Sequence, residues 1–327
     1  RHEGSSKFAS DNRWANFWSV TAGWRISNEE FMKKFEWLDD LKIRFGYGVT
    51  GNNDFSATYM ANMLGSDTNW MMPNGTWAYS YGKSQNVNPN LGWEEKKEWN
   101  LGADYSFFDG RLYGKFDYYR RKVDNLLFSV KVPQPPYTQG SQMQNIGSME
   151  SKGWEFEVGG DIIRTKNFTW STNMNLSHNT GKILTLEGDN SYHNGNGFVA
   201  PGSPGDASRM EAGSTIGSFY IWKFAGFDDE GKFLLYNKDG EVIPAAQKTE
   251  NDKQYIGNYT PKLIIGWSHT LTYKNLDLGI NLRSWIDFDV YNTINMYYGI
   301  QGQGNLNVLK DAYGKFDHIR GEKQICD

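Results

Sequence analysis

The stretch NLGADYSFFDGRLYGKFDYYR, residues 100–120, decides the fold class of this chain. An Asp-Gly pair separates two runs rich in aromatic residues, which predicts a β-hairpin with a tight turn. On the first arm, strand alternation puts Leu101 on one face and Asp104 on the other. Phe116 and Asp117 are divided in the same way on the second arm. Each arm therefore has an apolar and a polar face, as strands do in both soluble sandwiches and transmembrane barrels.

The same alternation recurs in eight runs, which predict eight antiparallel strands of roughly ten or more residues. The runs span residues 18–26, 41–49, 99–107, 112–118, 154–162, 168–176, 263–271 and 276–288. Their polar faces carry charged side chains in or beside the strands, among them Glu98, Asp104, Asp117, Arg283 and Asp287. Burying so many charges in a dry interior would cost on the order of several kcal/mol each, so the polar faces must contact water. In a soluble sandwich that water lies outside the protein, whereas in a transmembrane barrel it fills the lumen.

The links between the runs differ in length at the two ends of the predicted sheet. The short links are turns of about two or three residues, and they lie at Asp109-Gly110, 164–166 and Lys274-Asn275. A longer link on the same side, 28–40, is compatible with a short helix that has Phe31, Phe35 and Leu38 on one face. The long links span residues 51–92, 129–150 and 181–260. Short turns at one end and long loops at the other are typical of an outer-membrane barrel, in which the apolar faces point toward lipid.

Aromatic residues gather near the short turns. They are Tyr105, Phe107, Phe108, Tyr113, Phe168, Trp170 and Tyr273. Aromatic side chains concentrate at membrane–water interfaces, so this group predicts a girdle at the periplasmic boundary.

Composition excludes several classes of protein. The 327 residues include 34 basic and 38 acidic side chains, and a net charge of −4 does not indicate a nucleic-acid partner. No apolar run approaches twenty residues and the mean hydropathy is −0.67, which excludes a membrane-spanning helix. The single cysteine, Cys326, excludes a disulfide framework within the chain. An aromatic content of 16%, with 13 Trp residues, fits either aromatic belts or a sugar-binding surface.

Five segments resemble the C-terminal barrel of SusC/RagA-type TonB-dependent transporters of Bacteroidota. They are DNRWANFWSVTAGWRIS (11–27), LKIRFGYGVTGNN (41–53), NPNLGWEEKKEWNLGADYSFFDGRL (88–112), NIGSMESKGWEFEVGG (145–160) and NYTPKLIIGWSHTLTYKNLDLGI (258–280). The segments are spread over nearly the whole chain and keep the family's order. They combine turn residues, strand phase and loop positions, so the resemblance does not rest on one short motif.

The resemblance implies an importer of glycans or peptides in the outer membrane of a Gram-negative bacterium. In that family a SusD-like surface lipoprotein caps the barrel, and a plug domain fills the lumen and couples to TonB. Barrels of this kind close with about 22 strands, so eight strands are roughly a third of one. We therefore expect residues 1–327 to be a partial barrel domain, a fragment without the plug domain and the final strands.

Aromatic residues in the long links are the most plausible binding residues. They are Trp70, Trp77, Tyr79, Tyr81, Tyr137, Tyr192 and Trp222. Such rings can stack on sugar rings or peptide side chains, or bury against the lipoprotein partner. The competing interpretation is that they pack the long loops against each other.

The sequence offers little support for catalysis, so we expect no enzymatic activity. The adjacent carboxylates at Glu94-Glu95 point to opposite faces of a strand, as do those at Asp228-Asp229, which does not suit glycoside hydrolysis. No nucleotide-binding loop, nucleophile elbow or zinc signature is present.

No metal or cofactor site is expected either. The five histidines lack metal-ligand spacing. His178 and His269 fall in or beside the apolar strand faces that are predicted to point outward, which favours packing at the membrane interface. The segment 237–240, Asn-Lys-Asp-Gly, resembles the middle of a calcium loop, but Leu235 stands where the first ligand should be. A plain turn with Gly240 at positive φ is the better interpretation.

The leading functional hypothesis is a structural part of an active importer. The alternative is a secreted, aromatic-rich carbohydrate-binding β-domain, which should be complete in its own chain and soluble without detergent. The charged polar faces and the one-sided short turns favour the importer. The sequence does not distinguish a glycan from a peptide as substrate.

Overall fold

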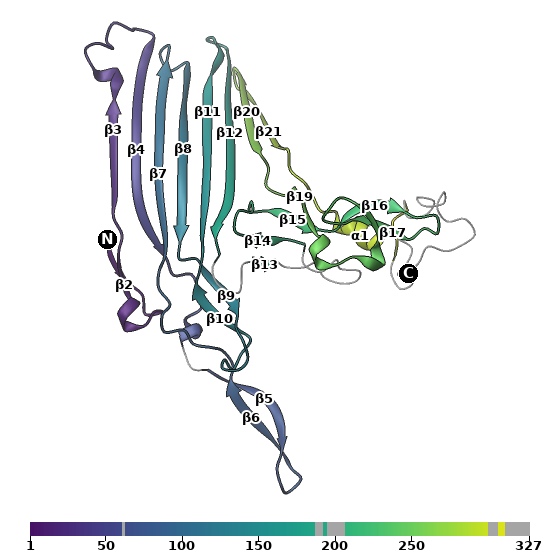
Figure 1. Ribbon diagram of the computed structural model, residues 1–327. Coiled ribbons are helices and arrows are strands. Elements are labelled where there is room, and N and C mark those ends of the chain that lie inside the picture. Colours follow the sequence, from purple (N-terminus) through teal and green to yellow (C-terminus); the bar gives the residue numbers. More distant parts are fainter. Residues whose placement is uncertain (61–62, 187–191, 195–206, 300–306, 311–327) are drawn as a thin grey trace. The chain divides into compact units, whose positions relative to one another are not determined.

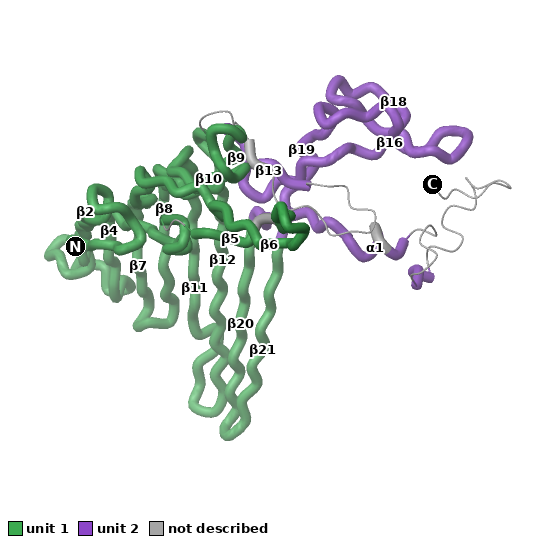
Figure 2. The backbone as a smooth tube through the Cα atoms, turned by 90° about the horizontal axis from the view of Figure 1, so that it is seen from below, with its two compact units in different colours: residues 1–191, 263–285 green, residues 192–262, 286–327 purple. Residues whose placement is uncertain are grey.

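The computed structural model describes residues 1–60, 63–186, 192–194, 207–299 and 307–310 (Figure 1). The chain divides into two compact units, which Figure 2 colours separately. Unit 1 comprises residues 1–191 and 263–285, and unit 2 comprises residues 192–262 and 286–327. In the described parts of the chain, no helix has the length and apolar character needed to cross a membrane.

Unit 1 is built around an eight-stranded sheet in which the long strands lie side by side in the order in which they occur in the chain (Figure 1). In spatial order from one edge, the strands are β3 (Ser19–Arg25), β4 (Leu38–Asn52), β7 (Glu94–Phe107), β8 (Leu112–Asp124), β11 (Ser148–Arg164), β12 (Phe168–Thr185), β20 (Leu263–Tyr273) and β21 (Leu276–Ile286). The pairings from β3 through to β20 are antiparallel. The predicted eight strands are confirmed, although β3 has only seven residues.

The register keeps the predicted faces across the sheet. One row of directly opposed residues crosses seven strands on the apolar face: Trp24, Ile43, Ala103, Phe116, Phe156, Leu176 and Ile265. A neighbouring row crosses the same strands on the other face: Arg25, Lys42, Asp104, Lys115, Glu157, Asn175 and Gly266. Asp104 and Asp117 therefore lie on the face opposite to Leu101 and Phe116, as the period of two predicts.

The hairpin between β7 and β8 has the predicted Asp-Gly turn. Asp109 and Gly110 have φ values of +56° and +73°, the left-handed region that a type I′ turn requires at both central positions. The carboxylate of Asp39 accepts hydrogen bonds from the backbone N–H of Asp109 at 3.1 Å and of Gly110 at 2.8 Å. A side chain of β4 thus holds the end of this hairpin, in addition to the hairpin's own ladder.

The short helix expected within residues 28–40 is wrong. The structure has a single 3-10 turn, η2 (Ile26–Asn28), and then separate turns up to the start of β4. The backbone bonds from Met32 to Glu29 and from Phe35 to Met32 each close one turn only. Glu29 itself is extended, with ψ of 144°, so no continuous helical ladder forms.

Three residues assigned to strand faces lie elsewhere, and one residue of the predicted girdle lies on the other face. Ile26 is in η2 and Phe288 lies beyond the end of β21. A register shift between Asp161 and Ile163 makes Ile162 a bulge residue. Tyr113 faces the polar side, because it lies opposite Ser106 and Gly159, so it does not belong to the apolar girdle.

A cluster of buried hydrophobic residues in unit 1 lies outside the eight long strands, in the segment before β3 and in the link between β4 and β7. It consists of Phe8, Phe17, Phe55, Leu91 and Trp93. The segment before β3 contains β1 (His2–Gly4), η1 (Ser10–Asn12) and β2 (Trp14–Asn16), and the links contain η3 (Ala57–Met60), β5 (Leu64–Met71), β6 (Trp77–Lys83), β9 (Leu127–Lys131) and β10 (Ser141–Asn145). The long links of unit 1 therefore form a packed structure of their own.

Asn86 ties two of these links together. Its side-chain N–H groups donate to the carbonyls of Gln139 at 2.6 Å and Ser141 at 2.8 Å. Its oxygen accepts from the backbone and hydroxyl of Thr138 and from the backbone of Gln139. Only 9% of Asn86 is exposed, so these bonds satisfy a buried amide.

Unit 2 contains only short elements, and its described strands form small antiparallel sheets. They are β13 (Tyr192–Asn194) with β14 (Arg209–Glu211), β15 (Ser218–Ile221) with β19 (Gln254–Asn258), and β16 (Lys223–Phe227) with β17 (Phe233–Tyr236) and β18 (Val242–Pro244). The helical pieces are η4 (Ala245–Gln247), η5 (Glu250–Asp252) and α1 (Thr293–Tyr298).

Replacing Asn86 by Ala should loosen the link that contains Thr138 and Gln139. Loss of a buried hydrogen-bonding group costs about 1–3 kcal/mol, so the amides of both residues should exchange hydrogen about tenfold faster or more. Hydrogen exchange read by mass spectrometry on the intact protein measures this. Asn90→Ala is the control, because within the described residues the Asn90 side chain makes no hydrogen bond. Equal protection of Thr138 and Gln139 in both variants would contradict the role of Asn86.

Candidate functional site

The polar face of the sheet carries ion pairs that link neighbouring strands. Arg44 on β4 donates to both carboxylate oxygens of Asp104 on β7, at 2.8 and 2.9 Å. The same guanidinium reaches Asp117 on β8 at 3.1 Å. One arginine therefore joins three strands, and its planar fork fits the bidentate contact with Asp104.

Two further clusters continue this pattern. Lys115 on β8 pairs with Glu157 on β11 at 3.0 Å, and Asn173 on β12 donates to the same carboxylate at 3.0 Å. Toward the long links, Glu98 accepts from Arg121 at 2.8 Å and pairs with Lys96 at 3.1 Å. The charges of this face are thus matched to one another while they remain partly exposed, as expected of a surface that contacts water.

Glycines give these long side chains room to lie flat across the sheet. A Cβ at Gly102 would lie 2.6 Å from the Asp117 carboxylate and 2.7 Å from the Arg44 guanidinium. A Cβ at Gly159 would lie 2.7 Å from the ring of Tyr113. The glycines of the polar rows therefore have a packing role, which strand alternation alone does not predict.

The five residues expected to face the lumen are divided between the two units. Glu98, Asp104 and Asp117 share the polar face described above, and Arg283 lines a cavity of about 810 Å³ with Asn281, Ser268 and others. Asp287 lies just after β21 in unit 2, where it pairs with Lys262 at 2.6 Å. A common lumen for all five stays a prediction.

Aromatic rows border the apolar face at both ends. On the turn side the rings of Trp37 and Phe107 lie 5.6 Å apart, within the region expected from the sequence. On the loop side a second row begins at Trp18, just before β3, and crosses five strands: Tyr47, Trp99, Tyr118, Trp154 and His178. From Trp99 to Phe107, eight steps of about 3.3 Å span about 26 Å along the strand. This length is comparable to the apolar band of outer-membrane barrels, which is about 25 Å tall.

Beyond the loop-side row, the same face becomes charged. Lys97 and Lys122 both pair with Asp124, at 3.1 and 2.8 Å, and Arg120 donates to Glu150 at 2.7 Å. The apolar surface thus ends sharply at the aromatic row. The sequence contains a signal for this aromatic row, a Trp or Tyr at the loop-side end of most runs, but the sequence analysis did not identify it.

The hairpin of β5 and β6 exposes four of the predicted loop aromatics. Trp70, Trp77, Tyr79 and Tyr81 are between 66% and 71% exposed. Trp77, Tyr79 and Tyr81 alternate along β6 and therefore share one face, whereas Trp70 pairs with Ala78 on the other. The structure thus brings three of the candidates together on one side of a hairpin.

The other three loop aromatics have different surroundings. Tyr137 is half-buried and lines a cavity of about 430 Å³ with Asn90, Gln144 and other amide residues. Trp222 donates to the Thr249 carbonyl at 2.9 Å and lies under the ammonium groups of Lys248 and Lys253, which is loop packing. Tyr192 belongs to β13, and its side chain lies outside what the structure describes.

Unit 2 contains a polar network that sequence reasoning missed. The Tyr255 hydroxyl donates to Glu211 at 2.8 Å, and Arg209 donates to the Tyr220 hydroxyl at 2.8 Å. Burial, together with the Glu211 carboxylate, raises the pKa of Tyr255 above its usual value. Hydrogen bonds from the Thr249 hydroxyl and backbone lower the pKa of Asp252. No sequence period signals these contacts, because they join short strands across long links.

The segment resembling a calcium loop is a turn, as predicted. Asn237 accepts from the backbone N–H groups of Asp239 and Glu241, and Gly240 has φ of +83°. Leu235 is buried within β17. In the described part of the chain no three His, Cys, Asp or Glu side chains group as metal ligands.

The histidines of the apolar phase pack against tryptophans. His178 lies opposite Trp154, with ring centroids 6.0 Å apart. His269 lies 4.5 Å from the ring of Trp267, and its Nδ1 is 3.3 Å from the indole nitrogen of Trp170. Both histidines thus pack against aromatic rings, and their position at a membrane interface stays a prediction.

Relatives with solved structures share this arrangement. The RagAB peptide importer in its "open-open" state superposes with a TM-score of 0.74 at 27% identity, covering 91% of this chain and 31% of that chain. In its "closed-closed" state the TM-score is 0.73 at 27% identity, with coverage of 88% and 31%.

Sequence comparisons agree with the structural ones. The TonB-dependent receptor SusC of Bacteroides thetaiotaomicron is 34% identical over 308 residues, which cover 89% of this chain and 29% of that protein. The TonB-dependent receptor P26 of Formosa agariphila is 32% identical over 311 residues, which cover 89% and 30%. The chain thus spans less than a third of the length of these relatives. A family model described as "TonB dependent receptor-like, beta-barrel" matches residues 1–292, and the chain therefore belongs to the TonB-dependent receptor-like β-barrel family.

Proposed function

We propose that the chain forms part of the barrel wall of a TonB-dependent importer in the outer membrane of a Gram-negative bacterium. The importer takes up glycans or peptides together with a SusD-like surface lipoprotein. The observation that carries this proposal is the two-faced sheet, with rows of exposed apolar side chains on one face and paired charges on the other.

The apolar face supports contact with lipid. Phe45, Leu101 and Phe116 lie in the middle of the sheet and are 45%, 47% and 40% exposed. A continuous apolar surface of this kind is unusual on a protein surrounded by water and marks an interaction site. Its aromatic borders and its width match the hydrocarbon layer of a bilayer.

The polar face supports a water-filled lumen. Its charges would be costly to desolvate, and their partial exposure fits a channel wall. In the complete protein the plug domain expected from the resemblance would lie against this face and couple to TonB.

The links at the other end support binding of a partner and a substrate. The packed core around Leu91 and Trp93 holds these links in defined positions, and the β5–β6 hairpin presents exposed rings. One relative is named a peptide importer, and the resemblance found in the sequence implies importers of glycans or peptides, so both substrate classes remain within the proposal.

The alternative, a secreted carbohydrate-binding domain, is not favoured. In water, such a domain would need another surface to cover its apolar face. In addition, the relatives are named TonB-dependent receptors and not binding modules. An enzymatic role has no support in the described site: Glu94 bonds to Asn52 and the Leu127 backbone, and Glu95 pairs with Lys97.

Fractionation and uptake by cells that make the intact protein test the proposal. The protein should be found in the outer membrane, and a lipoprotein should co-purify with it in mild detergent. Deleting the gene should abolish TonB-dependent uptake of a labelled neutral oligosaccharide or of a labelled oligopeptide. A water-soluble protein, or unchanged uptake of both substrate classes, would overturn the proposal.

Lysine substitutions should distinguish the two faces of β12. Leu176 lies in the central apolar row, so Leu176→Lys should destabilise the inserted barrel by about 2–4 kcal/mol. Ser177 faces the other side, opposite Glu155, so Ser177→Lys should cost much less. Denaturant titration of the intact barrel in lipid measures both. Equal losses of stability in the two variants would show that both faces contact the same solvent.

The exposed rings of β6 should contribute to capture of the partner. Replacing Trp77, Tyr79 and Tyr81 together by Ala should weaken co-purification of the lipoprotein at least tenfold, because aromatic anchors dominate interface energies. Phe31→Ala removes a similarly exposed ring on the turn side and should have no effect. Unchanged capture by a correctly inserted triple variant would leave these rings without a role in partner binding.

A further inference from the structure

Basic residues lie on the same face of the sheet as the apolar rows, beyond the aromatic row at the loop side. Each of them is two or four residues away from a member of that row in its own strand, so strand alternation keeps it on this face. We call these five residues the basic band: Lys97, Arg120, Lys122, Lys152 and Lys182. The band crosses four neighbouring strands, β7, β8, β11 and β12.

The register brings basic residues of the band directly opposite one another. Lys97 lies opposite Lys122, and Arg120 lies opposite Lys152. Like charges in directly opposed positions destabilise a pair of strands. Within the described residues, the side chains of Lys152 and Lys182 have neither an ion pair nor a hydrogen bond. The protein itself therefore offsets only part of the repulsion within the band.

The carboxylates at this end of the face are fewer than the basic groups. On the same four strands, three acidic residues lie beyond the aromatic row on this face: Glu95, Asp124 and Glu150. The side chains of Asp124 and Glu150 are 22% and 16% exposed, whereas their basic partners in the band are 40–53% exposed. The band therefore presents a net positive charge to its surroundings.

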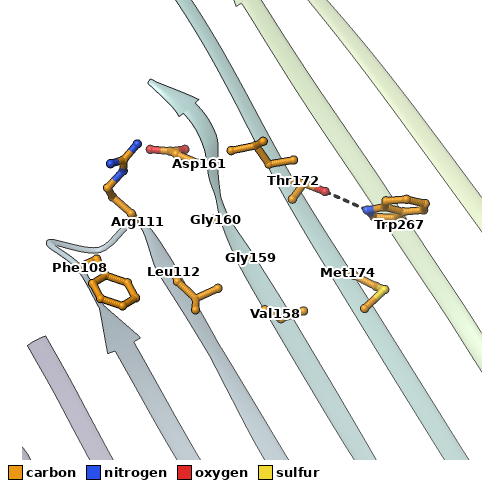
Figure 3. Close-up of a pocket in the computed structure, with 11 residues that line it drawn as sticks. Phe108, Arg111, Leu112, Val158, Gly159, Gly160, Asp161, Thr172, Met174 and Trp267 are labelled. Carbon is orange, nitrogen blue, oxygen red and sulfur yellow. Dashed lines mark hydrogen bonds between the residues drawn. The ribbon is translucent and has the colours of Figure 1, made fainter. Parts of the chain in front are cut away.

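The turn-side end of the same face differs in charge from the loop-side end. On the described residues of these four strands, the apolar rows continue to the turns with uncharged side chains. Among them Leu112, Val158 and Met174 line a cavity of about 470 Å³, which Figure 3 shows. Arg111 and Asp161, which also appear in that view, belong to the polar phase of strand alternation. The excess of positive charge is thus a feature of the loop-side end.

The position and width of the band match a lipid headgroup. Aromatic residues concentrate at the membrane–water interface, and the band begins two residues, about 7 Å, beyond the aromatic row. Lys97 on β7 and Lys182 on β12 are three strand spacings apart, which is about 14 Å. Lysine and arginine form charge-assisted hydrogen bonds with phosphate oxygens. A headgroup with phosphates at two positions therefore fits the band better than a single phosphate does.

We propose that the basic band binds a lipid of the leaflet on the loop side, one that carries phosphates at two positions of its headgroup and whose acyl chains lie on the apolar face. The inference rests on the proposed function, since it needs the apolar face to lie in a membrane and the long links to lie outside the cell. Charge selects this lipid, because the same face offers no matching band of basic residues, within the described parts of these strands, to the leaflet on the turn side.

Native mass spectrometry of the intact, purified importer tests the proposal. Diphosphoryl lipid A is titrated into the detergent micelles, and its dissociation constant is measured at low ionic strength. Replacing Lys152 and Lys182 together by Gln should weaken binding about twentyfold, because each basic residue near a charged lipid surface contributes about fivefold to the affinity. Lipid A from which the phosphates have been removed should bind the wild-type protein at least as weakly as intact lipid A binds this double variant.

A matched double variant serves as the control. Lys42→Gln and Lys166→Gln together remove two positive charges outside the band, one from the polar face and one from the link between β11 and β12. This variant should bind lipid A like the wild type. Uptake and outer-membrane insertion, measured on every variant, show whether each one has folded. Lys152→Gln alone should weaken binding about fivefold, and it decides if the Lys152 and Lys182 double variant does not insert.

The outcomes that overturn the inference can be told apart. An inserted, importing protein that binds lipid A equally well with and without Lys152 and Lys182 has no such site, and the proposed function is then unaffected. Equal binding of the dephosphorylated lipid would show that the band does not recognise phosphate. Displacement of lipid A by an equal concentration of inorganic phosphate would assign the band to a free anion and overturn the lipid site. A protein that is absent from the outer membrane overturns both the proposed function and the lipid site.

Discussion

The antiparallel register is the constraint on which the rest of unit 1 depends. Because side chains alternate with a period of two, a slip of one residue would move Asp104 and Glu157 to the apolar face and their apolar neighbours to the polar one. The fork of Arg44 across Asp104 and Asp117 fits only the observed register, since it joins residues of three adjacent strands. The register shifts at the turn side of the sheet, at Ile162 in β11 and between Leu38 and Asp40 in β4, lie near the ends of their strands, where few residue pairs remain beyond them.

The ion pairs of the polar face affect the positions of the charged side chains more than they affect the free energy of unfolding. Partly exposed pairs each contribute about 0–1 kcal/mol, so they do not hold the sheet together by themselves. Their effect is to give each charge a partner on the next strand, which keeps a wet surface ordered. The glycines opposite Asp117 and Tyr113 complete this arrangement, because any larger residue would push those side chains away from the sheet.

The links of unit 1 follow a different principle. Together with the segment before β3 they form a hydrophobic core that contains Phe8, Leu91 and Trp93, and Asn86 satisfies the backbone of a neighbouring link. In the proposed arrangement the eight-stranded sheet contacts lipid on one face and water on the other, so it needs no hydrophobic core of its own. The loops, which must keep their shape in water, need one. The proposed roles follow from this difference: the eight-stranded sheet contacts lipid and lumen, and the links present the exposed β5–β6 hairpin.

The sequence by itself determined the number of long strands, their faces, the Asp109-Gly110 turn and the family, because period-two alternation and turn chemistry are local properties. It erred where the local signal was ambiguous, at the supposed helix of 28–40 and at Ile162, whose bulge depends on the partner strand. Only the tertiary structure decided which loop aromatics are exposed, as Tyr79 is, and which are packed, as Trp222 is. These features arise where residues far apart in the chain meet, and no repeating pattern along the sequence encodes such meetings.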